Sequence, residues 1–397
     1  MIATRAKGLR YNVLGRQHIL SVLRGGRRHV GGGDAARAKA WKTEEAGGME
    51  QNLPLPLCKV DEKRSSVRLG ALVRAYNELR GAIAGELSSS PSFKRDDHAP
   101  NEENLCTELS WLFEDSVCLD PAELRRLLRS GGNECRSVEG EDEGRVIRSR
   151  LTLNEFQDVW HLRLRERLPI QYILGMASWY DLELRVGPGV LIPRPETEVL
   201  LDLALGALGE ERGLGSHPWL DLGTGTGALA IGLARHSEGA CGSRVRVEAI
   251  EASENAAAYA SENIERYGLQ DGVRLFRGSW FEPLEAEERH RKAFGGIVSN
   301  PPYITDEEMI GLQDEVRLHE PRSALFGGAT RGMDGLLHIV EESPKYLVPG
   351  GFLGLETGGP IQATHLGSLM RGQAWDRVEV KPDLQGVPRF LVARTRK

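Results

Sequence analysis

From Trp219 to the C-terminus, short apolar runs alternate with stretches of helical periodicity. The apolar runs are "WLDLG", "VRVEAIE", "VRLFRG", "GGIVSN", "GGFLGLE" and, at the end of the chain, "RVEVK" and "RFLVART". This rhythm predicts repeated strand–helix–strand units, which build a mostly parallel sheet with helices on both faces. A short loop with proline and glycine separates the last two runs, so we expect these strands to form an antiparallel hairpin. The sequence therefore predicts an α/β fold over residues 196–397.

Upstream of this part, apolar residues recur at the spacing of amphipathic helices. The pattern covers residues 66–87 and the stretches "CTELSWLFEDSV", "DPAELRRLLRS" and "LTLNEFQDVWHLRLRERL". Asp120 and Pro121 suit the N-cap and the first position of the third of these helices. Together the patterns predict a small helical domain over residues 61–168, which contains no chemical motif of its own.

Three further segments lie outside these regular patterns. The polar stretches 88–103 and 131–143 interrupt the helical domain, and we interpret them as loose surface insertions. After the domain, "QYILGMASWYDLELRVGPGVLIP" alternates apolar and polar residues around glycines. That alternation is typical of strands, so a β-hairpin linker is expected over residues 169–195.

The first 42 residues are rich in arginine and contain one acidic residue, Asp34. Apolar residues between Leu9 and Leu23 fall at roughly helical spacing beside the cations, which is the amphipathic pattern of an organellar transit segment. A basic tail without a targeting role is the alternative. We expect residues 1–60 to be a transit segment, and the protein to lie in a mitochondrial matrix or a plastid stroma, with the cytoplasm as the alternative.

Bulk composition excludes several classes of protein. The net charge of −6, from 51 basic and 57 acidic residues, argues against binding nucleic acid through phosphate neutralisation. No apolar window approaches the ~18 residues that a membrane helix needs. The five cysteines are scattered and the histidines form no HExxH pair, so we expect reduced thiols and no bound metal. An intracellular protein that acts neither in a membrane nor through a metal is the expectation.

The stretch "LDLGTGTGALAIGLA" predicts a strand, a glycine loop and a helix. The loop is Gly223-Thr224-Gly225-Thr226-Gly227, whose alternate glycines permit a sharp turn and let a ligand lie against the main chain. The third glycine comes earlier than in G-x-G-x-x-G, and no Lys-Ser/Thr pair follows as in a P-loop. The loop therefore suits a bulky, largely uncharged ligand edge rather than a polyphosphate. A glycine-rich turn without a ligand is the alternative.

Two side chains follow the next two predicted strands. Glu251 ends the strand after the glycine loop, where an acid can accept both hydroxyls of a ribose. Trp280 follows the third strand, where its indole can stack on an adenine. Each has a plainer reading on its own, since a carboxylate at a strand end is often merely solvated and a tryptophan after a strand is often core. Together with the glycine loop, they favour a nucleoside-binding edge.

The fourth strand ends in Asn300-Pro301-Pro302-Tyr303. Proline cannot donate to a sheet ladder, so the two prolines could simply end the strand. They also freeze the backbone, so that the Asn300 amide and nearby carbonyls point in fixed directions at the carboxyl end of the strand. At that edge of an open α/β sheet, fixed polar groups indicate a ligand site.

The chain resembles the class I S-adenosylmethionine methyltransferases that methylate planar nitrogens. The resemblance lies in the order of the glycine loop, the strand-end acid, the aromatic residue and the NPPY motif. Within that class, "LPIQYILG", "VLIPRPETEVLL", "NPPYI" and "EVRLHEPRSALFGG" are similar to the release-factor glutamine methyltransferases. The resemblance covers the chain closely from Leu168 onward and more loosely upstream. The IPRPETE block is similar to the release-factor branch rather than to the related branch that modifies a ribosomal protein.

The resemblance implies a seven-stranded Rossmann-like sheet, S-adenosyl-L-methionine as cofactor, and the glutamine of the Gly-Gly-Gln loop of a release factor as substrate. On the cofactor side, it implies that residues 223–227 line the methionine and ribose, that Glu251 holds the ribose, and that Trp280 neighbours the adenine. Two departures are visible: Glu251 stands where aspartate is more usual, and Ser279 stands where many relatives have an acid.

On the substrate side, the resemblance implies that Asn300 and the Pro301 carbonyl accept the amide hydrogens of the glutamine. Asn300 is also expected to contact the cofactor. Pro302 would hold these acceptors still, and Tyr303 would pack on the planar amide. Arg194 would lie near the cofactor or its entrance, oriented by Glu196 or Glu198, although both acids could instead complement a helix dipole. The alternatives are a nucleic-acid adenine amino-methyltransferase, whose motif is related, and a non-catalytic cofactor-binding protein with a helical interaction module.

Overall fold

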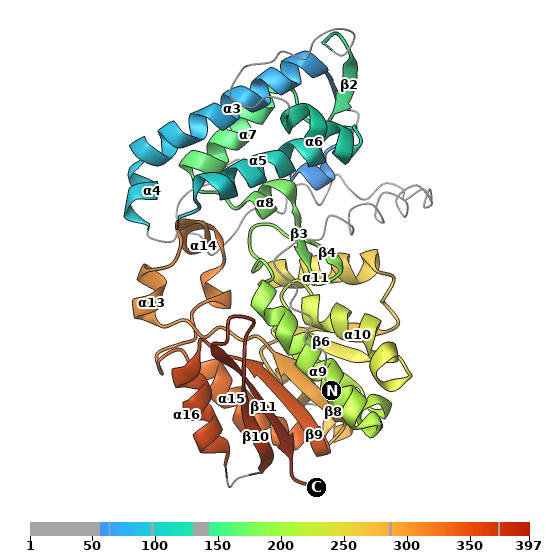
Figure 1. Ribbon diagram of the computed structural model, residues 1–397. Helices are drawn as coiled ribbons and strands as arrows, with labels where there is room; N and C mark the ends of the chain where they lie inside the picture. The colour runs from blue at the N-terminus through green and yellow to red at the C-terminus, as the bar shows by residue number, and fades with distance from the viewer. Residues whose placement is uncertain (1–55, 63, 97–98, 130–142, 286–287, 372–373) are drawn as a thin grey trace. The chain divides into compact units, whose positions relative to one another are not determined.

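The computed structural model describes residues 56–397, apart from residues 63, 97–98, 130–142, 286–287 and 372–373 (Figure 1). The expected transit segment, residues 1–60, lies almost entirely outside this range. The polar stretch 131–143 also falls outside it, except for its last residue.

Helices dominate the N-terminal part of the described chain, as the apolar spacing predicts. Their caps match the sequence signals, since Asp120 accepts hydrogen bonds from two backbone amides and Thr152 forms a capping box with Glu155. In the core between them, the rings of Phe113 and Phe156 stack with centroids 4.3 Å apart. The helices are α3 (Leu69–Ser89), α4 (Pro91–Arg95), α5 (Glu102–Ser116), α6 (Pro121–Arg129), α7 (Leu153–Arg165) and α8 (Ile170–Leu174).

Two features of this part differ from the sequence-based expectation. A small antiparallel sheet pairs β1 (Ser65–Arg68) with β2 (Val146–Ser149), and neither strand is long enough to give a clear alternating pattern. The segment 88–103 is not a loose insertion throughout. Phe93 on α4 is buried in the helical core, and the guanidinium of Arg167 lies over its ring.

A β-hairpin connects the helices to the main sheet, as predicted. It pairs β3 (Met176–Trp179) with β4 (Leu182–Arg185) in antiparallel register. Gly175, directly before β3, has a φ of 72°, a left-handed conformation that suits glycine at the end of a helix.

The main sheet has seven strands in the order β10-β11-β9-β8-β5-β6-β7. All neighbouring pairs are parallel except those of β11, which runs antiparallel to both β9 and β10. The predicted Rossmann-like sheet and its C-terminal antiparallel hairpin are therefore confirmed. The strands are β5 (Trp219–Leu222), β6 (Val247–Glu251), β7 (Val273–Arg277), β8 (Phe294–Ser299), β9 (Leu347–Glu356), β10 (Trp375–Pro382) and β11 (Pro388–Thr395).

Helices cover both faces of this sheet (Figure 1). On one face lie α9 (Glu198–Glu210), α10 (Ala228–Cys241) and α11 (Glu254–Arg266), and on the other lie α15 (Asp334–Tyr346) and α16 (Pro360–Met370). Strands β5 and β8 are buried along their whole length, as expected of central strands covered on both sides. Three short helices complete the domain: α12 (Glu282–Glu285), α13 (Asp306–Ile310) and α14 (Asp314–His319). Within the described chain, no helix is both long and apolar enough to cross a membrane.

Candidate active site

The glycine loop follows β5 at the carboxyl edge of the sheet. Gly223, Gly225 and Gly227 have φ values of 70°, 58° and 85°, a region that residues with a Cβ rarely adopt. Among the described residues, no atom lies within 4 Å of a Cβ built on Gly225, so this glycine borders open space. Thr224 and Thr226, which alternate with these glycines, are buried.

Asp221, the last acid of β5, lies beneath the loop and was not singled out from the sequence. Its Oδ2 accepts hydrogen bonds from Thr224 Oγ1 at 2.6 Å and from the Ala230 amide at 3.1 Å. Its Oδ1 is buried and has no hydrogen-bond partner among the described residues. Burial raises the pKa of Asp221 to about 7. The glycine loop therefore rests on a carboxyl group with one unused acceptor atom.

Glu251 ends β6 beside this loop, where the sequence placed it. Its Oε2 accepts a hydrogen bond from the Gly225 amide and its Oε1 accepts one from the Ser253 amide, each at 2.8 Å. Two backbone donors therefore fix the orientation of the carboxylate. Each oxygen keeps a second lone pair, which can accept a hydrogen bond from a ligand hydroxyl.

The indole of Trp280 lies between the glycine loop and α15. A Cβ built on Gly223 would lie 3.8 Å from Cζ3 of the indole, and one built on Gly335 would lie 2.8 Å from Cζ2. Glycine at position 335 therefore makes room for the ring. Trp280 itself is half-buried and has a φ of 48°, an uncommon conformation for a large residue.

The NPPY motif follows β8 and borders a cavity of about 420 Å³. Asn300 Nδ2 donates a hydrogen bond to Thr197 Oγ1 at 3.0 Å, and the Tyr303 hydroxyl donates to Glu356 Oε1 at 3.1 Å. Neither Thr197 nor Glu356 was assigned a role from the sequence. The cavity is lined by Leu191, Arg194, Asn300, Pro301, Pro302, Tyr303, Ile304, Gly311, Leu312, Gln313, Val316, Ala324 and Leu325.

Arg194 lines this cavity together with the NPPY residues. Its Nη2 donates a hydrogen bond to Glu320 Oε1 at 2.7 Å, and Glu320 also accepts one from the Ile192 amide. Burial raises the pKa of Glu320, and the neighbouring Arg194 charge opposes this shift. The sequence suggested Glu196 or Glu198 as the partner of Arg194. The ion pair found here involves Glu320, which lies in the EVRLHEPRSALFGG block but more than a hundred residues away along the chain.

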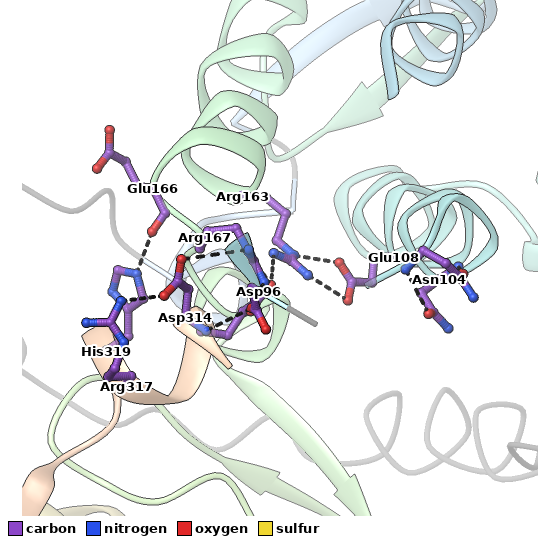
Figure 2. A network of polar contacts seen from close by, with 11 residues as sticks. Asp96, Asn104, Glu108, Arg163, Glu166, Arg167, Asp314, Arg317 and His319 are labelled. Carbon is purple, nitrogen blue, oxygen red and sulfur yellow. Dashed lines mark hydrogen bonds and ion pairs between the residues drawn. The ribbon is translucent and has the colours of Figure 1, made fainter. Parts of the chain in front are cut away.

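A buried network of charged side chains joins the helical part to α14 (Figure 2). Arg163 of α7 and Arg167, two residues beyond the end of α7, each donate a hydrogen bond of 2.8 Å to Oε1 of Glu315. Arg163 also donates to Glu108 on α5, and Arg167 donates to Asp96. Because Val316 of α14 and the preceding Gln313 line the cavity, this network fixes one cavity wall to the helices.

The residues around the glycine loop fit S-adenosylmethionine. Three features suit its ribose and adenine: the open space over Gly225, the free lone pairs of the Glu251 carboxylate and the aromatic ring of Trp280. Among the described residues, no group of three or more His, Cys, Asp or Glu side chains is placed to hold a metal ion.

Gly225→Ala should weaken binding of S-adenosylhomocysteine by roughly 10-fold, because the added methyl group enters the space over the loop in a left-handed backbone conformation. Isothermal titration calorimetry measures this affinity directly. Gly239→Ala is the matched control, because Gly239 lies within α10 and has no described atom within 4 Å of its built Cβ. It should bind normally, and equal affinities of the two variants would place the ligand elsewhere.

Comparison with known proteins shows the family of this chain. Residues 203–317 match the methyltransferase small domain family. The release factor glutamine methyltransferase of Thermosynechococcus vestitus is 44% identical over 249 residues, which are 63% of this chain and 82% of that protein. The Synechocystis protein of the same name is 38% identical over 72% of this chain and 89% of its own length. A methyltransferase structure from Pyrococcus furiosus aligns at 20% identity over 55% of this chain and 91% of its own, with a TM-score of 0.40. The chain belongs to the release factor glutamine methyltransferase family.

Proposed function

We propose that this protein transfers the methyl group of S-adenosylmethionine to the side-chain amide nitrogen of the glutamine in the Gly-Gly-Gln loop of a peptide chain release factor. The observation that carries this proposal is the placement of Asn300 and Tyr303 on the wall of a cavity of about 420 Å³ in a chain of this family. A cavity of this size accommodates a single side chain with its flanking backbone.

The chemistry requires alignment of the amide nitrogen more than a base. An amide nitrogen is a poor nucleophile, because its lone pair is delocalised into the carbonyl. When bound, S-adenosylmethionine supplies an electrophilic methyl group. The protein therefore has to hold the nitrogen in line with that methyl group and to keep water out, and both tasks depend on fixed groups.

Asn300 and its neighbours supply these fixed groups. The side-chain oxygen of Asn300 and the carbonyl of Pro301 accept the two amide hydrogens of the substrate, which orients the nitrogen. Pro301 and Pro302 restrict the backbone so that both acceptors keep their direction. Burial raises the pKa of Tyr303, so its hydroxyl stays protonated and donates to Glu356, while its ring packs on the planar substrate amide.

An intact release factor bearing the Gly-Gly-Gln loop should be methylated far faster than a short peptide with the same loop. Contacts far from the glutamine help to position a weak nucleophile, so they contribute to rate as well as to affinity. Mass spectrometry of the digested factor locates the added methyl group. A factor carrying Glu in place of the loop glutamine is the control and should gain none. Equal rates on peptide and factor, or preferential labelling of DNA or RNA, would contradict the proposal.

We further propose that residues 1–60 direct the protein to a mitochondrion or a plastid. The support is the arginine-rich, acid-poor composition of the segment and the helical spacing of its apolar residues. A fluorescent reporter fused behind residues 1–60 should collect in one organelle. A matched fusion in which the arginines are replaced by glutamate should remain in the cytoplasm, and cytoplasmic location of both would refute the targeting role.

A further inference from the structure

The carboxyl group of Glu356 is deeply buried next to two residues of the candidate site. Glu356 ends β9, next to the carboxyl end of β8, and is only 1% exposed. Its Oε2 accepts a hydrogen bond from Thr197 Oγ1 at 2.7 Å, and its Oε1 accepts one from the Tyr303 hydroxyl at 3.1 Å. Glu356 does not line the cavity itself, so it acts on the site only through these two partners.

Thr197 connects this carboxylate to Asn300. A hydroxyl group has one hydrogen to donate, and an ionised carboxylate can only accept. Because Thr197 gives its hydrogen to Glu356, its oxygen can only accept from Asn300, whose Nδ2 lies 3.0 Å away. The nitrogen end of the Asn300 amide is thereby held toward Thr197. The oxygen end is left for the cavity, where the proposed reaction needs an acceptor.

Protonation of Glu356 would remove this constraint. A protonated carboxyl group can donate to Thr197, and Thr197 can then donate to the oxygen of Asn300. The amide would then turn its NH₂ group to the cavity. An NH₂ group cannot accept hydrogens from a substrate amide. Burial raises the pKa of Glu356 to about 7, against the lowering effects of its two hydroxyl partners and of Arg389, while Glu196 adds to the rise.

We propose that Glu356 is a positioning residue that acts through Thr197 to hold the side-chain oxygen of Asn300 toward the substrate. This inference rests on the proposed function for the role of that oxygen. It adds that the ionised Glu356 carboxylate sets the direction of the hydrogen bonds between Glu356 and Thr197 and between Thr197 and Asn300. That direction decides which end of the Asn300 amide faces the cavity.

The first test compares Thr197→Val with Thr197→Ser. Valine has nearly the same shape but no hydroxyl, whereas serine keeps it. The kcat of Thr197→Val should fall by roughly 10- to 100-fold with S-adenosylhomocysteine affinity unchanged, because only the orientation of the acceptor is lost. Thr197→Ser should recover most of the rate. Equal rates of the two variants would overturn the inference.

The second test is the pH profile of kcat. Because the ionised form is the productive one, kcat of the wild type should fall as the pH drops through the pKa of Glu356, near 7. Tyr303→Phe removes a hydrogen bond to the ionised form, so it should move this acid limb to higher pH. Glu356→Gln should abolish the limb, and a limb that persists unchanged in Glu356→Gln would refute the assignment.

The third test does not depend on activity. In protein labelled with ¹⁵N-asparagine, the side-chain NH₂ signals of Asn300 should titrate with Glu356 in the wild type and stay constant in Glu356→Gln. Asn300 signals that are constant in both proteins would contradict the inference even if the release factor is methylated. A titrating Asn300 in a protein that leaves the release factor unmodified would support the positioning role and count against the proposed substrate.

Discussion

Asn300→Ala should lower kcat for methyl transfer by about two orders of magnitude or more, while S-adenosylhomocysteine binds nearly as well as to the wild type. Acceptors aimed at a reacting nitrogen act mainly in the transition state, so their loss affects turnover more than ground-state binding. Asn300 lies on the cavity wall and donates a hydrogen bond to Thr197, which agrees with a role on the substrate side. Single-turnover rates at saturating cofactor measure the effect.

Glu251→Ala is the informative counterpart of this variant. Glu251 contacts the Gly225 amide and lies at the end of β6, so its removal should chiefly weaken cofactor binding. At saturating cofactor, its turnover should approach that of the wild type. If both variants lost affinity and turnover in the same proportion, the division between a cofactor side and a substrate side would be wrong.

Arg163→Ala should lower the free energy of unfolding by about 3–5 kcal/mol, because Glu108 loses the cation that it faces and the buried Glu315 loses one of two guanidinium partners, the other being Arg167. Arg163 is 2% exposed and is held by Glu108 on one side and Glu315 on the other. Arg165, on the same helix, is the matched control. It is exposed and lies 3.7 Å from Glu86, so Arg165→Ala should change the unfolding free energy by less than about 1 kcal/mol.

Urea denaturation without cofactor gives both values. The double variant Arg163→Ala/Glu108→Ala should lose less than the sum of the two single losses, because the pair acts as a unit. A loss of under about 1 kcal/mol for Arg163→Ala would mean that water solvates these carboxylates in solution.

The parts of the fold that could be predicted are those encoded by neighbouring residues. The period of the apolar runs predicted the sheet and its terminal hairpin, and the alternate glycines marked a loop that does adopt left-handed φ values. Strands β1 and β2 escaped notice, because each spans only a few residues and gains its stability from its partner rather than from its own pattern.

The hydrogen-bond partners in the site could not be predicted in the same way. Thr197 and Glu356 are 159 positions apart, and Arg163 and Glu315 are 152 apart. No local periodicity relates such pairs, and the parallel pairing of β8 with β9 places Glu356 beside the end of β8, which Asn300 follows. The NPPY motif identified residues that line the cavity. Local sequence did not pair them with their hydrogen-bond partners, Thr197 in a 3₁₀ turn and Glu356 at the end of β9.

The charged network on α7 has a consequence for how this protein can change during evolution. Arg163 and Arg167 belong to the helical part, and Glu315 belongs to α14, between β8 and β9 of the sheet domain. A chimera that combined helices from one relative with the sheet domain of another would need compatible charges at all of these positions. Recombination at the boundary near Leu168 would otherwise bury mismatched ions, so the two parts are expected to be inherited together rather than exchanged as independent modules.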